Sequence, residues 1–438
     1  MFGFAGGTRP VFAERPQLVA LPNLGRASCA SWLDVPFSFC PSQRRARPQV
    51  GRAREWGLVE TSRRSVARPA ERNLLPAICD VSVTNVCNAA CDFCNFARDK
   101  NLAGPRRYID PAEFSRALPV LRRRRIRYMT FQGGEPLVHP EIVALVRAAA
   151  RAGIECGLIT NGWFLPEHIE ALAAAGLKRL LVSIDSDSMP KHDANRGLNG
   201  LHRRIAEGIA RARTFGIPTS ASVTVSRLVD YEALPETLER LGFHAVTFSY
   251  PNREAFASNS LVYSEDSALI DQQPDELLAA LAAIRRMKRR FRVLNPAVSL
   301  DEVARSIRGE KQVIPCIGGH KYFYLDWNLD IWRCEAWNQP LGSVFDLDDF
   351  PDQRDECHAC TMACYRHASA LMHGAIAVTD SAQALVHGDL PRAIRSLWQR
   401  GVAHSIWALA AEHYPRLALS SQRRRAGQYS AATQPSQE

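Results

Sequence analysis

The sequence predicts an α/β fold in which parallel strands and helices alternate around a full or partial barrel. Strand-then-helix patterns repeat six times between residues 77 and 249. Polar or glycine-rich residues follow several of these strands, at the end where barrel enzymes place their chemistry. At 438 residues with a 46% hydrophobic fraction, the chain is long enough for one such domain and a smaller one.

The first predicted strand covers residues 77–84, which alternate in polarity and are rich in β-branched side chains. Asp110 and Pro111 are typical of a helix start, and this helix is expected to continue to about Arg122. Further strands are expected at 126–131, 154–160, 180–185, 220–225 and 245–249. Helical patterns lie between them at 140–152, 166–175, 201–215 and 233–241.

The strongest chemical signal follows the first strand, where Cys87, Cys91 and Cys94 lie within eight residues. Three thiolates at this spacing can ligate three irons of a cubic [4Fe–4S] cluster and leave the fourth iron open. An open metal position is typical of catalytic rather than structural metal sites. The alternative is a structural zinc site, which needs a fourth ligand, and nothing places the nearest later histidine, His139, there. The pattern favours the cluster over zinc.

The pattern Cys87-x3-Cys91-x2-Cys94, with aromatic Phe93 before the last cysteine, resembles the radical S-adenosylmethionine (radical SAM) superfamily over roughly residues 77–250. The resemblance implies a partial (β/α)6 TIM-like barrel over residues 77–300, in agreement with the six predicted units. It implies S-adenosylmethionine at the open iron, with Phe93 among the cofactor-binding residues. It also implies an electron donor such as flavodoxin or ferredoxin, and one-electron cleavage to a 5′-deoxyadenosyl radical. The protein would supply orientation, electrostatics and a dry site.

The second predicted strand ends in a glycine-rich turn, Gly133, Gly134, Glu135 and Pro136. Two glycines let a ligand approach the backbone closely, although this sequence alone describes only a tight turn. Placed one strand after the cysteine loop, it matches the motif that, in the resembling family, binds the amino group of S-adenosylmethionine.

The fourth predicted strand ends with Ser183 and Asp185, whose side chains alternate and can therefore face one ligand. The resemblance places the ribose hydroxyls or the methionine carboxylate of S-adenosylmethionine in this region. Arg196 follows and has two interpretations: it pairs with the ligand carboxylate, or it forms a salt bridge at a helix N-terminus.

Residues 301–370 form a second cysteine-rich region. Its thiols are Cys316, Cys334, Cys357, Cys360 and Cys364, and a hairpin with strands at 322–325 and 331–332 is expected between the first two. This arrangement resembles the SPASM or shorter twitch extension of the family, although Leu329 stands where that extension has a glycine. A second [4Fe–4S] cluster is favoured over a zinc site, and a disulfide pair ranks third. The spacing leaves open which four of the five thiols are ligands.

The rest of the chain carries weaker signals. Residues 1–76 hold twelve arginines and five acidic residues and lack a periodic pattern, so we expect an irregular, disordered segment. Most of the net charge of +10 is there, and the default interpretation is no nucleic-acid partner. Residues 371–419 predict amphipathic helix that by default packs on the barrel, and 420–438 a mobile tail. No apolar stretch is long enough for a transmembrane span, and the clustered cysteines favour a reducing cytoplasm.

Three functional hypotheses remain. The leading one is a radical SAM enzyme, an oxidoreductase or transferase acting on a C–H bond of a peptide or small molecule. The second is a non-catalytic Fe–S or zinc-binding protein on the same barrel. The third is a radical SAM enzyme that modifies RNA, which would require an ordered basic segment near the active site.

Overall fold

The computed structural model describes residues 72–97, 105–251 and 267–412. The expectations for most of the basic segment 1–76, and for the tail 420–438, lie outside these residues. The described residues all belong to one unit of the chain, residues 64–438.

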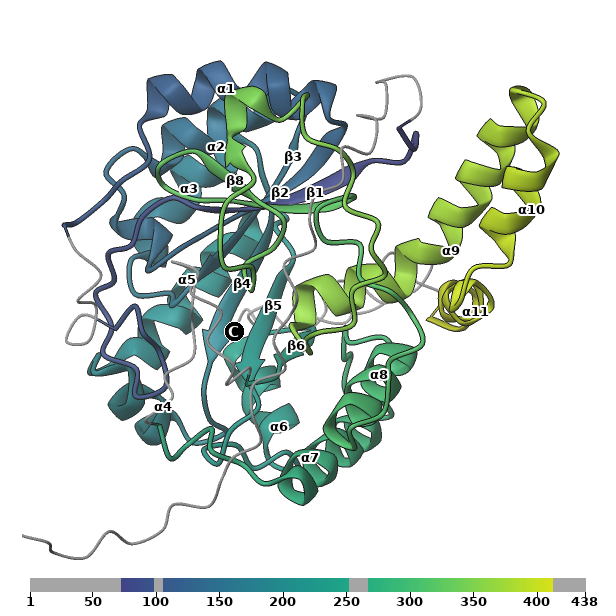
Figure 1. Cartoon of the computed structure of the whole chain (residues 1–438). Helices are drawn as coiled ribbons and strands as arrows, with labels where there is room; N and C mark the ends of the chain where they lie inside the picture. Colours follow the sequence, from purple (N-terminus) through teal and green to yellow (C-terminus); the bar gives the residue numbers. More distant parts are fainter. Residues whose placement is uncertain (1–71, 98–104, 252–266, 413–438) are drawn as a thin grey trace, which may run out of the picture. The chain divides into compact units, whose positions relative to one another are not determined.

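One mixed sheet of nine strands forms the centre of this unit, in the order β6-β5-β4-β3-β2-β1-β7-β8-β9 (Figure 1). The strands are β1 (Ala77–Ser82), β2 (Ile126–Gln132), β3 (Glu155–Thr160), β4 (Leu177–Ile184), β5 (Thr219–Thr224), β6 (Val246–Ser249), β7 (Tyr322–Leu325), β8 (Asp330–Trp332) and β9 (Gly342–Ser343). Strands β1 to β6 pair in parallel, each with its predecessor in the sequence. The open strand order confirms the predicted partial barrel of six parallel strands.

Helices connect the parallel strands and cover the outer face of the sheet (Figure 1). They are α1 (Pro111–Arg123), α2 (Ile142–Arg151), α3 (Leu165–Ala175), α4 (Met189–Arg196), α5 (Leu201–Thr214) and α6 (Leu234–Leu241). The Asp110 side chain accepts a hydrogen bond from Glu113 N at 2.8 Å, so the predicted cap of α1 is confirmed. The α1 ring of Phe114 packs edge-on against Phe131 of β2, with centroids 6.0 Å apart, which ties helix to sheet.

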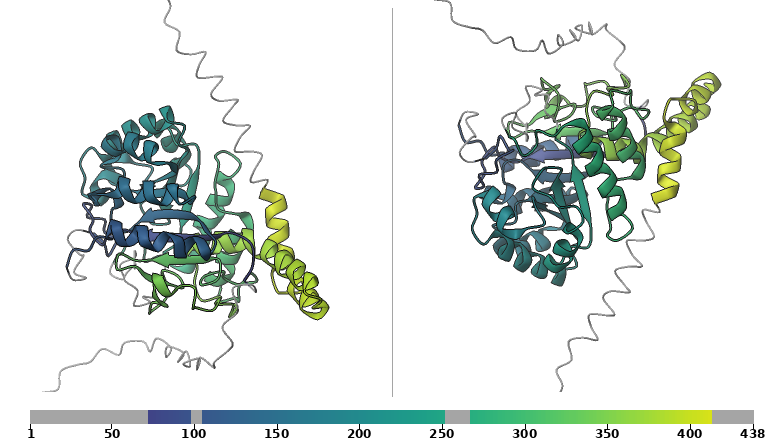
Figure 2. Two further views of the ribbon diagram at one scale, coloured as in Figure 1. Left: turned by 90° about the horizontal axis from the view of Figure 1, so that it is seen from above. Right: turned by 90° about the horizontal axis from the view of Figure 1, so that it is seen from below.

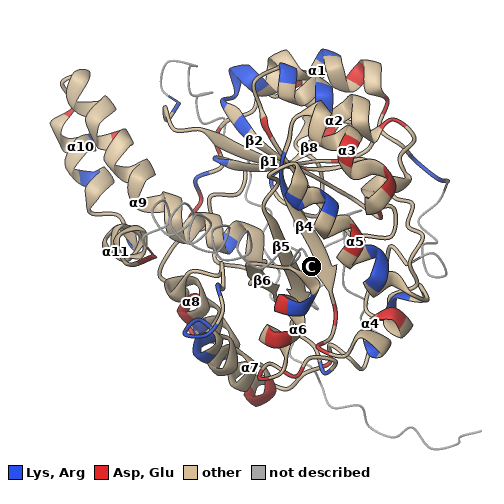
Figure 3. Cartoon of the chain, turned by 180° about the vertical axis from the view of Figure 1, so that it is seen from behind, with Lys and Arg blue, Asp and Glu red and all other residues tan. Residues whose placement is uncertain are grey.

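Two helices with no counterpart in the sequence predictions follow the barrel, α7 (Pro274–Met287) and α8 (Ala297–Ile307). Short 3-10 turns lie at Pro136–Val138 and Val344–Asp346. Figure 3 shows basic and acidic residues interspersed over α4 to α8, without one extended basic face on that side of the described chain.

The predicted hairpin is confirmed and continues the barrel sheet. Strand β7 pairs in parallel with β1, while β8 pairs antiparallel with β7. Asp326 organises the turn, because its carboxylate accepts hydrogen bonds from Asn328 N (2.9 Å), Asp330 N (3.0 Å) and Trp332 Nε1 (3.0 Å). Leu329 has φ 64°, the left-handed conformation that glycine adopts most easily. The backbone of a glycine-containing turn is therefore kept with a leucine in its place.

Three helices end the described chain, α9 (Ala363–Val386), α10 (Leu390–Leu397) and α11 (Val402–Glu412). Helices α10 and α11 pack on α9, and α11 also contacts α8. In Figures 1 and 2, α10 lies away from the sheet. The apolar stripe predicted to pack on the barrel is largely exposed: Val402 is buried, but Trp398 is 85% and Trp407 62% exposed. None of the described helices has the length and apolar character needed to cross a bilayer.

Candidate functional site

The three cysteines after β1 line a single cavity of about 740 Å³. Cys91 is buried, and Cys87 and Cys94 are partly buried. Burial raises the pKa of all three thiols, to about 12 for Cys91, while the nearby Arg196 guanidinium opposes this shift at Cys91. The structure therefore brings together the three predicted thiols, at the C-terminal end of the first strand, with a cation that favours their thiolate form.

The glycine-rich turn after β2 packs directly on the chain that leads into the cysteine loop. Gly134 N donates to Thr84 O at 2.9 Å, and Glu135 N donates to Val86 O at 2.8 Å. A Cβ atom at Gly133 would lie 2.4 Å from Thr84 O, and one at Gly134 only 2.2 Å from Val86 O. These glycines are needed at this position because backbone occupies the space that a side chain would fill.

The Glu135 carboxylate lies within the protein and is fully engaged there. It accepts hydrogen bonds from Thr160 Oγ1 (2.6 Å), Asn161 N (2.7 Å) and Leu137 N (3.0 Å). Burial nevertheless raises its pKa above the usual range for a glutamate, against the effect of these bonds. Glu135 thus fixes the end of β3 against the turn.

Asp185 and Arg196 form a buried, bidentate ion pair. Arg196 Nε lies 2.8 Å from Asp185 Oδ2, and its terminal nitrogen lies 2.6 Å from Oδ1. Arg196 also fixes the cysteine loop, because its carbonyl accepts a hydrogen bond from Ala90 N at 2.9 Å. The prediction of a salt bridge at a helix N-terminus is wrong in its position: Arg196 is the last residue of α4, which ends at Gly197 with φ 61°. Burial alone would raise the pKa of Asp185, and Arg196 outweighs it and lowers that pKa.

Ser183 lies on a cavity wall rich in hydroxyl groups. The β4–β5–β6 register aligns Ser183 with Ser222 and then with Thr247. Other hydroxyl side chains on this wall are Ser220, Thr224 and Ser249. Because small polar side chains replace the bulky residues that fill a closed barrel, the interior stays open to a ligand. Phe93 also lines this cavity, and its role in cofactor binding stays a prediction.

Residues 81–241 match the family model for the radical SAM superfamily. The chain carries a radical SAM domain.

Relatives of this radical SAM domain differ in activity. The AdoMet-dependent heme synthase of Methanosarcina barkeri is 32% identical over 171 residues, which cover 37% of this chain and 46% of that protein. The GTP 3′,8-cyclase of Aquifex aeolicus is 31% identical over 160 residues, 35% of this chain and 49% of that protein. The chain thus spans about half the length of these relatives. The crystal structure of Streptococcus suis SuiB shares the fold, with a TM-score of 0.50 at 14% identity over 66% of this chain and 68% of SuiB.

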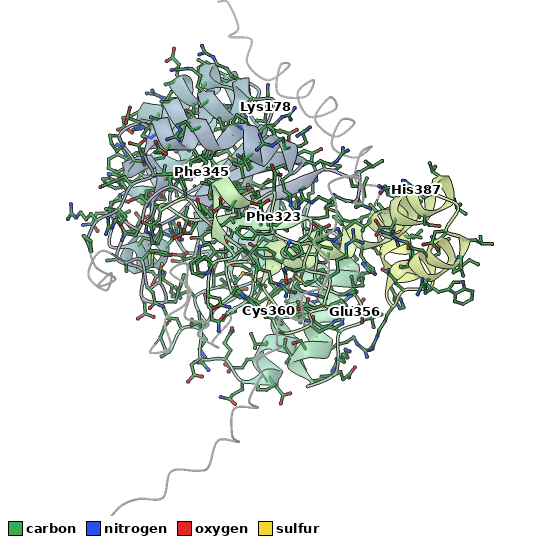
Figure 4. All side chains as sticks on the ribbon, turned by 45° about the horizontal axis from the view of Figure 1, so that its top comes forward. Lys178, Phe323, Phe345, Glu356, Cys360 and His387 are labelled. Atoms are coloured by element: carbon green, nitrogen blue, oxygen red, sulfur yellow. The ribbon has the colours of Figure 1, made fainter. Side chains whose placement is uncertain are left out.

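Of the five cysteines that follow the radical SAM domain, Cys316 influences three of the others. Besides burial, the Cys316 thiol raises the pKa of Cys334, Cys357 and Cys360, the last to about 12. Cys316 N also donates to Cys357 O at 2.9 Å. For Cys364 the largest influences after burial are Glu335 and Asp80, and the Cys360 thiol also raises its pKa. Figure 4 shows Cys360 with Phe323 in the body of the unit, apart from His387 at the end of α9.

The thiols of this region are not drawn together as tightly as a bound zinc ion would hold them. A tetrahedral zinc site with Zn–S bonds of about 2.3 Å brings its sulfurs to about 3.8 Å from one another. Within the described part of the chain, no three thiols lie within 4.8 Å of one another. All ten described cysteines are free, so the structure contains no disulfide among them.

A group of residues not predicted from the sequence lies in the same cavity. Asp80, Glu335 and Cys364 each offer a ligand atom, and these atoms lie within 4.8 Å of one another. Burial raises the pKa of Asp80 to about 6, and burial with the Asp80 charge raises that of Glu335 to about 8. The one available sequence signal was Asp80 itself, a carboxylate in the middle of the first predicted strand. Glu335, which follows Cys334, lies more than 250 residues later in the sequence, so no local pattern links it to Asp80.

Proposed function

We propose that this chain is a radical SAM enzyme that uses S-adenosylmethionine to act on a C–H bond of a peptide or small-molecule substrate. The observation that carries the proposal is the convergence of Cys87, Cys91 and Cys94 with the glycine-rich turn on one cavity. When bound, a [4Fe–4S] cluster and S-adenosylmethionine supply a 5′-deoxyadenosyl radical after one-electron reduction. A donor such as flavodoxin or ferredoxin would provide the electron.

The residues of this chain would hold and orient these groups. Cys87, Cys91 and Cys94 would ligate the cluster, and the turn 133–136 would offer backbone carbonyls to the amino group of S-adenosylmethionine. Arg196 is held by Asp185, and it orders the loop through its carbonyl. Ser183 and its hydroxyl neighbours would face the ribose. The enclosed barrel would exclude water from a reactive intermediate.

A second [4Fe–4S] cluster would be held by Cys316, Cys334, Cys357 and Cys360. The influence of Cys316 on the other three supports this set, whereas Cys364, which Cys360 also influences, lines the cavity. A cluster there would stand beside the substrate space. Arg333 lies near this thiol group, since Cys357 and Cys316 help to raise its pKa, and it would offset part of the cluster's negative charge.

The substrate is the least determined part of the proposal. The related proteins are named for heme synthesis and for GTP cyclisation, so likeness in this domain does not select a substrate. An RNA substrate would depend on the basic segment, which lies outside the described residues. A non-catalytic Fe–S or zinc protein would not need the open, hydroxyl-lined cavity beside the three thiols.

The test combines metal content with product analysis on anaerobically reconstituted protein. We expect about eight irons per chain, from two four-iron clusters, and 5′-deoxyadenosine after dithionite reduction. Cys91→Ala should abolish 5′-deoxyadenosine formation, whereas Cys156→Ala, which removes a buried thiol of β3 far from the loop, should retain it. Zinc in place of iron, with no 5′-deoxyadenosine, would refute the proposal.

A further inference from the structure

A buried asparagine beside the cavity contacts two side chains of the cavity wall. Asn295 lies between α7 and α8 and is fully buried. Its side-chain nitrogen, Nδ2, lies 2.8 Å from Tyr250 Oη and 3.0 Å from His367 Nε2. Tyr250 follows β6, His367 belongs to α9, and both line the cavity that contains the cysteine loop. Three segments that are distant in the sequence thus meet at one amide group.

The orientation of this amide follows from its two contacts with the backbone of β6. Phe248 N donates to Asn295 Oδ1 at 2.8 Å, and Asn295 Nδ2 donates to Phe248 O at 2.9 Å. Exchanging the amide oxygen and nitrogen would place donor against donor and acceptor against acceptor. Nδ2 therefore faces Tyr250 and His367, and an amide nitrogen donates hydrogen bonds without accepting them.

The contact with Nδ2 determines where the hydrogens of both side chains lie. His367 Nε2 must be unprotonated to accept from Nδ2, so the neutral imidazole carries its hydrogen on Nδ1. Burial, together with the charges of Lys288 and Arg366, lowers the pKa of His367 to about 3, so the ring is neutral at physiological pH. Tyr250 Oη likewise presents a lone pair to Nδ2, and its O–H points elsewhere.

Neither of these hydrogens has an acceptor in the described part of the chain. His367 Nδ1 makes no hydrogen bond there, and it is not one of the polar atoms buried without a partner, so it reaches open space. The Tyr250 hydroxyl donates to no residue of the described ranges. Leu294 and Ala363 are apolar neighbours on the same cavity wall. When a ligand displaces water from this corner, the two donors are costly to leave unpaired, so the ligand needs an acceptor oxygen there.

The charges around the site favour an uncharged acceptor. The two cations that lower the pKa of His367 are already paired with glutamates. Lys288 Nζ lies 3.0 Å from Glu412, and the Arg366 guanidinium lies 3.1 Å from Glu302. A carboxylate bound here would be buried without a counter-charge of its own, whereas a neutral oxygen would not need one.

We propose that Tyr250 and His367 bind an uncharged carbonyl group of the substrate, as a ketone or an amide presents. A carbonyl oxygen has two lone pairs, so it can accept from both the Tyr250 hydroxyl and His367 Nδ1–H. The donors line the same cavity as the cysteine loop, so the carbonyl would fix the orientation of the substrate relative to the cofactor. The inference rests on the proposed function and adds the substrate class.

Binding of small probes to the anaerobic, cluster-loaded full chain tests this assignment. Cyclohexanone supplies the carbonyl, and methylenecyclohexane has the same shape with a CH₂ group in place of the oxygen. Dissociation constants are measured by ligand-observed saturation-transfer NMR, and the selectivity is their ratio. We expect Tyr250→Phe and His367→Phe each to lower the selectivity for cyclohexanone by about fivefold, because each removes one donor.

The matched control is Tyr231→Phe. Tyr231 packs against Phe248 with ring centroids 6.1 Å apart, but it is not part of the cavity wall, so this variant should keep the wild-type selectivity. Unchanged selectivity in Tyr250→Phe or in His367→Phe would overturn the proposal, as would the absence of saturable cyclohexanone binding to the wild-type chain. Tighter binding of cyclohexanecarboxylate than of cyclohexanone would overturn it in favour of an anion site.

A measurement on the wild-type chain covers the case in which a variant does not fold. In protein labelled with ¹⁵N-histidine, the ring signals of His367 are assigned through its edge-on contact with the Tyr250 ring. They should show the Nδ1–H tautomer at neutral pH, and cyclohexanone should shift the Nδ1 signal. An Nε2–H tautomer would overturn the proposal. Formation of 5′-deoxyadenosine by the wild-type chain reports the proposed function separately, so either idea can fail alone.

Discussion

Substitution of Gly134 by alanine tests whether the glycine-rich turn and the cysteine loop depend on close backbone packing. The new Cβ would lie 2.2 Å from Val86 O and 2.5 Å from Val86 C. Side-chain carbons do not approach other atoms closer than 3.0 Å, so the two backbone segments must separate by about 0.8 Å. Overpacking of this kind costs about 1–3 kcal/mol. The 2.8 Å bond from Glu135 N to Val86 O would be weakened as well, at about 0.5–1.5 kcal/mol.

We therefore expect Gly134→Ala to lower the free energy of unfolding by about 2–4 kcal/mol. It should also lower the iron retained by the cysteine loop, because Val86 precedes Cys87. The assay is anaerobic urea denaturation together with iron analysis. The matched control is Gly157→Ala on β3, where the nearest atoms to a new Cβ are 3.8 Å away and stability should be unchanged or slightly higher. If both variants have equal stability and iron content, the packing argument is wrong.

Four further predictions concern other parts of the structure. Asp185→Asn leaves the buried Arg196 charge uncompensated and should lower the free energy of unfolding by about 3–5 kcal/mol in urea titrations; a loss no larger than that of the exposed-pair variant Glu207→Gln would contradict it. Burial lowers the pKa of His192 to about 4; because an unfolded histidine titrates near 6.5, stability should fall by on the order of 3 kcal/mol as pH drops from about 6.5 to 4. His192→Gln should flatten this pH profile, and an unchanged slope would argue against the buried neutral histidine. Cys316→Ser should reduce iron from about eight to about four per chain while Cys364→Ser retains about eight, and the reverse result would place Cys364 in the ligand set. Leu329→Gly should have a free energy of unfolding about 1–2 kcal/mol higher than Leu329→Ala, because the left-handed conformation at φ 64° is unfavourable for alanine and not for glycine. Equal free energies of unfolding would show that the turn changes its conformation in the alanine variant.

The barrel could be predicted from the sequence because its signals are local. Alternating β-branched runs, the cap at Asp110 and the cysteine spacing each lie within a few residues. Helix α4 was not predicted, since Met189–Arg196 carries polar residues on most of its surface and no apolar period. Helices α7 and α8 were likewise not assigned. The apolar residues near Trp398 and Trp407 have helical spacing, but periodicity does not reveal whether an apolar face is covered.

The candidate site was predictable only where its residues are close in sequence. The turn 133–136 and the three cysteines came from local motifs, and the structure places them together. The internal roles of Glu135 and Asp185 were not accessible, because their partners Thr160 and Arg196 are defined by strand packing and by the end of α4. The choice of ligands that we propose within the second cysteine group also depends on tertiary structure. Spacing alone treats Cys360 and Cys364 alike.

The pairing of β7 with β1 explains how residues of the C-terminal extension come to line the cavity beside the first cysteine group. Strand β1 carries Asp80 and leads into the cysteine loop, while β7 carries Tyr322 and continues through β8 to Cys334 and Glu335. Because Val81 pairs with Leu325 in the same sheet, the loop and the extension are joined by backbone hydrogen bonds rather than by a flexible linker. The position of Tyr322 in the extension relative to the strand that leads into the cysteine loop is thus fixed by the sheet itself.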